Sequence, residues 1–132
     1  MKIFALPFFV LSFSACGVLV PVEGPVPTSE VQVTLPQAGS VVTSPLNIEG
    51  SAPGPWFFEA SLPVTLEAED GTVLARGAAQ AQSSWQTVER VEFMATLEFD
   101  PGSYAEGVLI FEKDNPSGLP EHSGSYEMGV RF

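Results

Sequence analysis

Apolar and polar residues alternate along much of the chain after residue 30, with the period of two that is typical of a strand with one buried face. The alternation is longest from Val91 to Phe99. Val108 to Phe111 is a denser apolar run and predicts a central strand. No part of the sequence after the first thirty residues has a clear helical period. The other alternating apolar positions are Val31, Val33 and Leu35; Leu62, Val64, Leu66 and Ala68; and Tyr126, Met128, Val130 and Phe132.

Turn residues separate these segments. Asp70-Gly71 lies between two apolar runs, where it predicts a tight β-hairpin. The 12 Gly and 12 Pro of the chain indicate many turns and therefore many short strands. About seven short strands in roughly a hundred residues have the dimensions of an immunoglobulin-like domain. We therefore predict an all-β fold, an immunoglobulin-like β-sandwich of about seven antiparallel strands.

The first residues of the chain have the organisation of a bacterial lipoprotein signal. Met1-Lys2 is a short positive region, and residues 3–13 form an apolar run too short to cross a bilayer as a helix. Phe13-Ser14-Ala15-Cys16-Gly17 then resembles a lipobox, in which small residues precede a Cys that becomes the lipidated mature N-terminus. Phe13 replaces the Leu usually found there. The alternative is ordinary secretion after a cut behind Ser14, which would leave Cys16 without a role.

The sequence therefore divides into three parts. Residues 1–15 are the predicted lipoprotein signal peptide. Residues 16–29 contain the lipidated Cys16 and a Pro-rich tether that reaches ~40 Å when extended. Residues 30–132 are the predicted sandwich domain. We expect the protein to cross the cytoplasmic membrane and to remain in the cell envelope, held in a membrane by the lipid on Cys16.

The charge of the chain excludes two classes of partner. The 5 Lys and Arg stand against 16 Asp and Glu, a net charge of −11. Nucleic acids and anionic lipid headgroups both require a basic surface, so neither is expected as a direct partner. Because Cys16 is the only cysteine, no intrachain disulfide can form, and the fold must rest on apolar burial alone.

The polar residues form no recognisable catalytic or metal-binding motif. His122 is the only histidine and lies in a polar loop, where a lone His is usually solvated. No Gly-x-Ser-x-Gly motif surrounds a serine, and no pair of acids lies in a recognisable cleft motif. Acidic turns could offer oxygen atoms to calcium, but the Asp-x-Asp-x-Asp spacing is missing. We expect no enzyme activity, no cofactor and no metal.

Aromatic residues cluster at Trp56-Phe57-Phe58. In a strand, Phe57 would point away from the other two rings. We therefore expect Phe57 or Phe58 to pack in the core. Trp56 follows Gly54-Pro55 and is expected to be partly exposed, where it could contact a sugar or a peptide.

Antiparallel strands place alternate connections at the same end of a sandwich. The connections at 52–59, 81–90 and 114–125 should therefore meet at one end, with the Asp70 turn at the other. The alternative is that Trp85 only closes the core and the last of these loops packs over it. The predicted binding residues at this end are Trp56, Trp85, Asn115, Pro116 and Leu119.

Seven segments, in this order, resemble one protein family. They are Val42-Thr43-Ser44-Pro45-Leu46-Asn47-Ile48-Glu49-Gly50; Trp56-Phe57-Phe58-Glu59-Ala60; Asp70-Gly71 with Val73-Leu74-Ala75; Trp85; Val91-Glu92-Phe93; Glu112-Lys113-Asp114-Asn115-Pro116-Ser117-Gly118-Leu119-Pro120-Glu121; and Val130-Arg131-Phe132. The ordered set resembles the immunoglobulin-like domain associated with bacterial spore germination proteins. Glu92 and Gly129 depart from its pattern, which often has Pro there. The resemblance implies the predicted fold, in an envelope lipoprotein or beside other domains, and brings no catalytic residues.

These observations favour a non-catalytic binding or scaffolding domain displayed on the bacterial cell envelope. Its expected partner is an unidentified envelope protein or a glycan. A protease inhibitor or a chaperone-like envelope lipoprotein is the alternative, and an envelope hydrolase is a further one. A role in spore germination would rest on the family's name alone.

Overall fold

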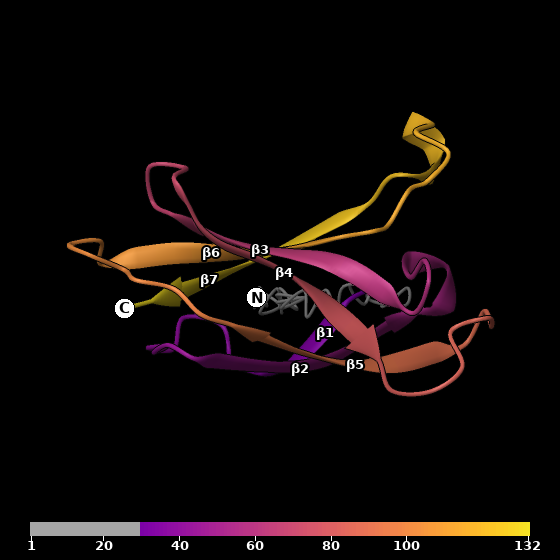
Figure 1. Cartoon of the computed structure of the whole chain (residues 1–132), viewed down its shortest axis with the longest axis horizontal. Helices are drawn as coiled ribbons and strands as arrows, with labels where there is room; N and C mark the ends of the chain where they lie inside the picture. The colour runs from indigo at the N-terminus through magenta and orange to yellow at the C-terminus, as the bar shows by residue number, and fades with distance from the viewer. Residues whose placement is uncertain (1–29) are drawn as a thin grey trace, which may run out of the picture.

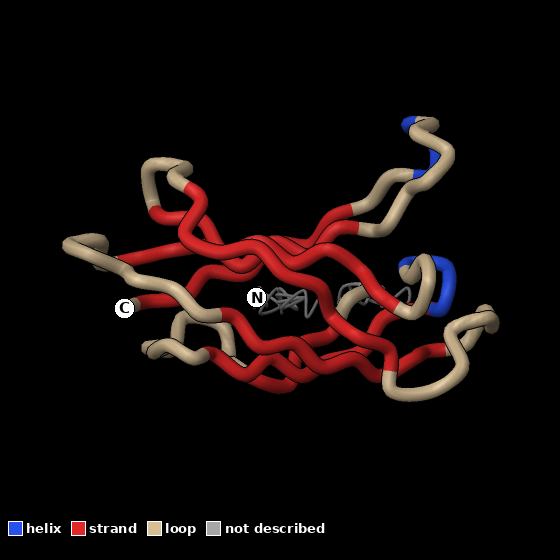
Figure 2. Tube along the Cα trace, viewed as in Figure 1, coloured by secondary structure: helices blue, strands red, loops and turns tan. Residues whose placement is uncertain are grey.

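Residues 30–132 are described by the computed structural model, and they form seven strands (Figures 1 and 2). The predicted signal peptide and tether lie outside the described residues. In the described part, helix is confined to the short 3-10 turns η1 (Gly54–Trp56) and η2 (Pro120–His122), and no helix could cross a membrane. The strands are β1 (Gln32–Leu35), β2 (Leu46–Pro53), β3 (Ser61–Ala68), β4 (Val73–Ala81), β5 (Arg90–Leu97), β6 (Glu106–Glu112) and β7 (Ser125–Arg131).

The strands form two layers joined along one side. β1, β2 and β5 make one layer, and β4, β3, β6 and β7 make the other, with every neighbouring pair antiparallel. β4 belongs to both layers: most of it pairs with β3, and its last residues Gln80 and Ala81 pair with β5. Figure 1 shows β4 passing from the upper layer to the lower one. The predicted all-β, immunoglobulin-like fold of seven antiparallel strands is confirmed.

The segment after β1 crosses to the second layer and pairs with β7. The Gly39 N–H donates to the Gly129 carbonyl at 2.8 Å, and the Arg131 N–H donates to the Ser40 carbonyl at 2.9 Å. The Val42 N–H donates to the Arg131 carbonyl at 2.8 Å. The segment therefore covers part of an edge strand that would otherwise be open to pairing with another chain.

The inward faces of the two layers share one apolar core. The Phe93 ring centroid lies 5.7 Å from that of Phe111 and 6.4 Å from that of Phe57, so it contacts both layers. Gly50 of β2 makes room for this ring, because a Cβ there would lie 2.8 Å from it. No polar side chain in residues 30–132 is buried. The alternation predicted for β3 and β5 is confirmed: the buried residues are Leu62, Val64, Leu66, Ala68, Val91, Phe93, Ala95 and Leu97.

β1 departs from the predicted alternation. Val31 is buried and Val33 is half-buried, but Leu35 is exposed, although all three were placed on one face. The pairing of β1 with β2 shifts its register between Val33 and Leu35. Such an irregularity changes the face on which the following side chains lie, so the prediction for Leu35 was wrong.

The Asp70 turn is the predicted hairpin between β3 and β4. Gly71 has a φ of +89°, in the left-handed region that glycine adopts without strain. Asp70 accepts bonds from the Thr72 N–H at 2.9 Å and from the Tyr104 hydroxyl at 2.8 Å. The backbone bond from Thr72, and then the side-chain bonds from Thr72 and Tyr104, lower the pKa of Asp70. Since Tyr104 follows β5, this contact ties two turns together at what we call the far end.

Phe93→Ala should lower the free energy of unfolding by about 3–5 kcal/mol, because it removes a fully buried ring between the layers. The next residue, Met94, lies on the exposed face of β5, so Met94→Ala should cost less than about 0.5 kcal/mol. Urea unfolding of the protein measures both changes. A loss for Met94→Ala as large as that for Phe93→Ala would contradict the register of β5.

Candidate binding site

Three connections meet at the end of the sandwich opposite Asp70 (Figures 1 and 2). They are residues 54–60 between β2 and β3, residues 82–89 between β4 and β5, and residues 113–124 between β6 and β7. We call them together the loop end. The predicted grouping of these connections is confirmed. It follows from the antiparallel order of the strands.

Backbone contacts tie the three connections to one another. The Gly54 N–H donates to the Glu89 carbonyl at 2.9 Å, and the Asp114 N–H donates to the Trp56 carbonyl at 2.9 Å. A side chain at Gly54 would collide with the carbonyl of Thr87. Glycine is therefore required where the first connection crosses the second.

Trp56 is buried, so the prediction that it is partly exposed was wrong. Its side chain and that of Phe57 are both 3% exposed, whereas Phe58 is 41% exposed. Strand alternation fails here because Gly54–Trp56 forms a 3-10 turn, and Pro55 near its start favours that conformation. The indole Nε1–H donates to Glu30 Oε2 at 2.7 Å, which satisfies the polar atom of the buried ring.

Trp85 is half-buried and packs against the core. Its ring meets Phe58 edge-to-face, with centroids 6.4 Å apart and planes at 68°. This agrees with the alternative that Trp85 closes the end of the core. The β6–β7 loop, however, lies against Trp56, whose ring is 3.3 Å from the position of a Cβ at Gly124. Phe58, and neither Trp, is the most exposed aromatic ring at the loop end.

Hydrogen bonds within the β6–β7 loop hold it in one shape. Asn115 Nδ2 donates to the Leu119 carbonyl at 2.8 Å. Ser117 Oγ donates to Asn115 Oδ1 at 2.6 Å and accepts from the Leu119 N–H at 3.2 Å. Ser123 Oγ donates to the Pro120 carbonyl at 2.6 Å. Asn115 and Ser117 therefore order the loop through their side chains.

His122 is oriented by the same network. Its Nδ1 lies 3.0 Å from Ser117 Oγ. The direction of this hydrogen bond depends on which nitrogen of the ring carries the proton. His122 is exposed, as expected of a lone histidine in a polar loop. The spacing of five residues between Ser117 and His122 is not typical of any known motif, so only the folded loop shows that they are paired.

A cleft of about 320 Å³ lies between the first and third connections. Its apolar side has the exposed ring of Phe58, and its polar side has Lys113 and Asp114, of opposite charge, together with His122. An apolar surface beside a few fixed polar groups suits a sugar ring or a peptide side chain. The lining residues are Pro55, Phe57, Phe58, Lys113, Asp114, Asn115, Pro116, Ser117 and His122.

The five predicted binding residues are thus divided by the structure. Asn115 and Pro116 line the cleft. Trp56 is buried beneath the loop, and Trp85 supports Phe58 from the side. Leu119 is exposed but does not line the cleft. Whether any of them binds a ligand stays a prediction.

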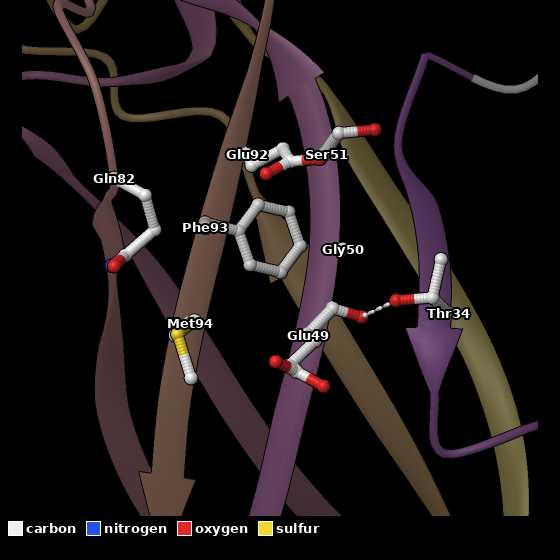
Figure 3. Close-up of a pocket in the computed structure, with 8 residues that line it drawn as sticks. All are labelled: Thr34, Glu49, Gly50, Ser51, Gln82, Glu92, Phe93 and Met94. Carbon is white, nitrogen blue, oxygen red and sulfur yellow. Dashed lines mark hydrogen bonds between the residues drawn. The ribbon is translucent and has the colours of Figure 1, made fainter.

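A second hollow, of about 190 Å³, lies on the outer face of β1, β2 and β5 (Figure 3). Its floor is the backbone of Gly50 and the edge of Phe93, which belongs to the core. Thr34 Oγ1 donates to the Glu49 carbonyl at 3.0 Å across it. Apart from Gln82, which follows β4, all of its lining residues lie on strands, whereas the loop-end cleft is lined by residues of two connections. The loop-end cleft is therefore the better candidate. Among residues 30–132, no three His, Cys, Asp or Glu side chains are grouped to hold a metal ion.

Trp56→Ala should lower the free energy of unfolding by about 3–5 kcal/mol, because it removes a buried ring from beneath the loop. Phe58→Ala should cost clearly less, since much of that ring already contacts water. Thermal unfolding followed by circular dichroism measures both variants. A melting temperature unchanged by Trp56→Ala would show that this Trp is an exposed platform after all.

Comparison with known protein families matches residues 30–118 to the immunoglobulin-like domain of bacterial spore germination. The match ends inside the β6–β7 loop, and β7 completes the same sheet beyond it. Curated proteins and solved structures gave no match. Domains of this kind are generally non-catalytic. The chain belongs to the family of the immunoglobulin-like domain of bacterial spore germination.

Proposed function

We propose that this protein is a non-catalytic binding or scaffolding domain, displayed on the bacterial cell envelope by a lipid on Cys16, which captures its ligand at the loop end. The observation that carries the proposal is the cleft beside a loop whose shape is held by its own hydrogen bonds. A loop that is already ordered loses less conformational entropy on binding, and this raises affinity without further contacts.

The lining of the cleft supports an envelope protein or a glycan as the ligand. Phe58 offers an aromatic face on which a sugar ring or an apolar side chain can stack. Lys113, Asp114 and His122 offer both donors and acceptors. The name of the family links it to spore germination, and such a role for this chain would be an analogy.

The arrangement of Ser117 and His122 supports binding over hydrolysis. A nucleophilic serine gives its proton to the histidine, which a third group orients. Here the Ser117 hydroxyl donates its hydrogen bond to Asn115 Oδ1 at 2.6 Å instead. Within residues 30–132, Ser117 is the only side-chain hydrogen-bond partner of His122, so no carboxylate orients the ring.

The anchoring part of the proposal predicts that labelled palmitate is incorporated into the wild-type protein and not into Cys16→Ser. Several acyl chains on one cysteine hold a protein in a membrane durably, at about 0.8 kcal/mol per buried CH₂. Growth on labelled palmitate, followed by gel fluorography of membrane and medium fractions, measures this. Unlabelled wild-type protein in the medium would rule out the lipid anchor.

The binding part predicts that the loop end contacts a partner in living cells. A photo-crosslinking residue, p-benzoylphenylalanine, placed at Phe58 should form adducts with an envelope component under ultraviolet light. The same residue at Val73 is the control, because Val73 is also 41% exposed but begins β4 at the far end. Gel shifts detect the adducts and mass spectrometry names the partner. Adducts from position 73 and none from position 58 would place the binding surface elsewhere.

A further inference from the structure

The chain enters the described domain at the loop end. The Glu30 side chain accepts the bond from Trp56 Nε1 at 2.7 Å, and its backbone carbonyl accepts one from Arg90 Nη1 at 2.9 Å. Both partners belong to the loop end or border it. Phe132 lies at the opposite end, where its N–H donates to the Ala105 carbonyl at 3.0 Å. The N-terminal attachment point and the candidate binding cleft therefore share one end of the sandwich.

The length of chain before Glu30 limits how far this end can be from the predicted lipid. Residues 17–29 separate Cys16 from Glu30, and they span ~40 Å when extended as polyproline II. The far end is separated from the loop end by the length of the strands. When residues 17–29 are extended away from the membrane, the loop end is therefore the part of the domain nearest to it.

Each connection of the loop end carries one exposed apolar side chain. These are Phe58, Val88 and Leu119, of which Val88 is 86% exposed. Three such side chains at the attached end form apolar contact points on separate loops. A contact between a tethered domain and the membrane needs little intrinsic affinity, because the tether keeps the domain at a high effective concentration near the membrane surface.

The charge of the domain selects the kind of surface. The only charged residues before Glu30 are Lys2 and Glu23. Residues 30–132 therefore contain four of the 5 basic residues and fifteen of the 16 acidic ones, a net charge of −11. An anionic bilayer would repel such a domain, and a zwitterionic one would not. The cleft has Lys113 beside Asp114, and this pair matches the phosphate and the ammonium of a zwitterionic headgroup.

We propose that the loop end rests on the zwitterionic phospholipid surface of the membrane that carries the lipid anchor, through Phe58, Val88, Leu119 and the cleft beside Phe58. This proposal rests on the lipidation of Cys16. It replaces the envelope protein or glycan of the proposed function with the phospholipid headgroup layer as the ligand of the loop end, and it leaves the far end facing away from the membrane.

Two natural probes lie at the contact. Trp56 and Trp85 are the only tryptophans of the chain, and both belong to the loop end. The full-length lipoprotein, which keeps Trp56 and its bond to Glu30, is purified from membranes and reconstituted in phosphatidylcholine vesicles with and without brominated acyl chains. The Trp85→Phe variant, in which only the buried Trp56 remains, identifies the share of the quenching that belongs to Trp85. We expect brominated lipid to quench the fluorescence of Trp85.

Matched substitutions separate docking from folding. Val88→Asp should abolish the quenching, because it replaces an exposed apolar contact with a charge. Val41→Asp is the control, since Val41 is 59% exposed and pairs with Arg131 toward the far end, and it should leave the quenching unchanged. Vesicles rich in phosphatidylglycerol should weaken the quenching at low salt, and added salt should restore it.

The outcomes distinguish this proposal from the lipid anchor beneath it. Palmitate-labelled protein whose Trp85 is not quenched in phosphatidylcholine would overturn the docking and leave the anchor in place. Loss of quenching with Val41→Asp as well as with Val88→Asp would also overturn it. Photo-crosslinks from position 58 to phospholipid would support the docking. Crosslinks from that position to a protein alone, without quenching, would assign the loop end to a membrane-associated protein instead.

Discussion

The contact of Phe93 with both layers is the interaction on which the rest of this structure depends. Its ring faces Phe111 on one side and Phe57 on the other, over a glycine that leaves room for it. A single cysteine cannot form a disulfide within the chain, so the layers are held together by apolar burial and by backbone pairing, of β4 with β5 and of the segment after β1 with β7. Burial alone has no direction, and it is the fit of these rings that selects one relative placement of the layers.

The same contact positions the loop end. Because Phe57 is held in the core by Phe93, the preceding 3-10 turn is fixed and Trp56 is directed inward beside it. Trp56 then bonds to Glu30 through its indole, and its carbonyl accepts a bond from Asp114. The β6–β7 loop and the start of the described chain are thus both attached to one buried aromatic pair. The candidate site therefore packs directly on the core, and the core holds it in place.

This arrangement gives the two ends of the domain different roles. The loop end holds the exposed ring of Phe58, the cleft and the point where the chain arrives from Cys16. The far end has turns tied by Asp70 and Tyr104, where hydrogen bonds to an exposed carboxylate hold the hairpin in place. The candidate cleft and the start of the described domain therefore share one end.

The sequence by itself determined the strands, the hairpin at Asp70-Gly71 and the grouping of the connections, because alternation, turn chemistry and antiparallel order are local or depend only on strand order. Only the tertiary structure decided that Trp56 is buried, since its partner Glu30 lies 26 residues away and the 3-10 turn that contains Trp56 breaks the alternation. Leu35 is exposed through a shift in its pairing with a neighbouring strand, which no pattern within β1 encodes. The pairing of His122 with Ser117 likewise exists only once the loop has folded, because it depends on side chains brought together by backbone turns.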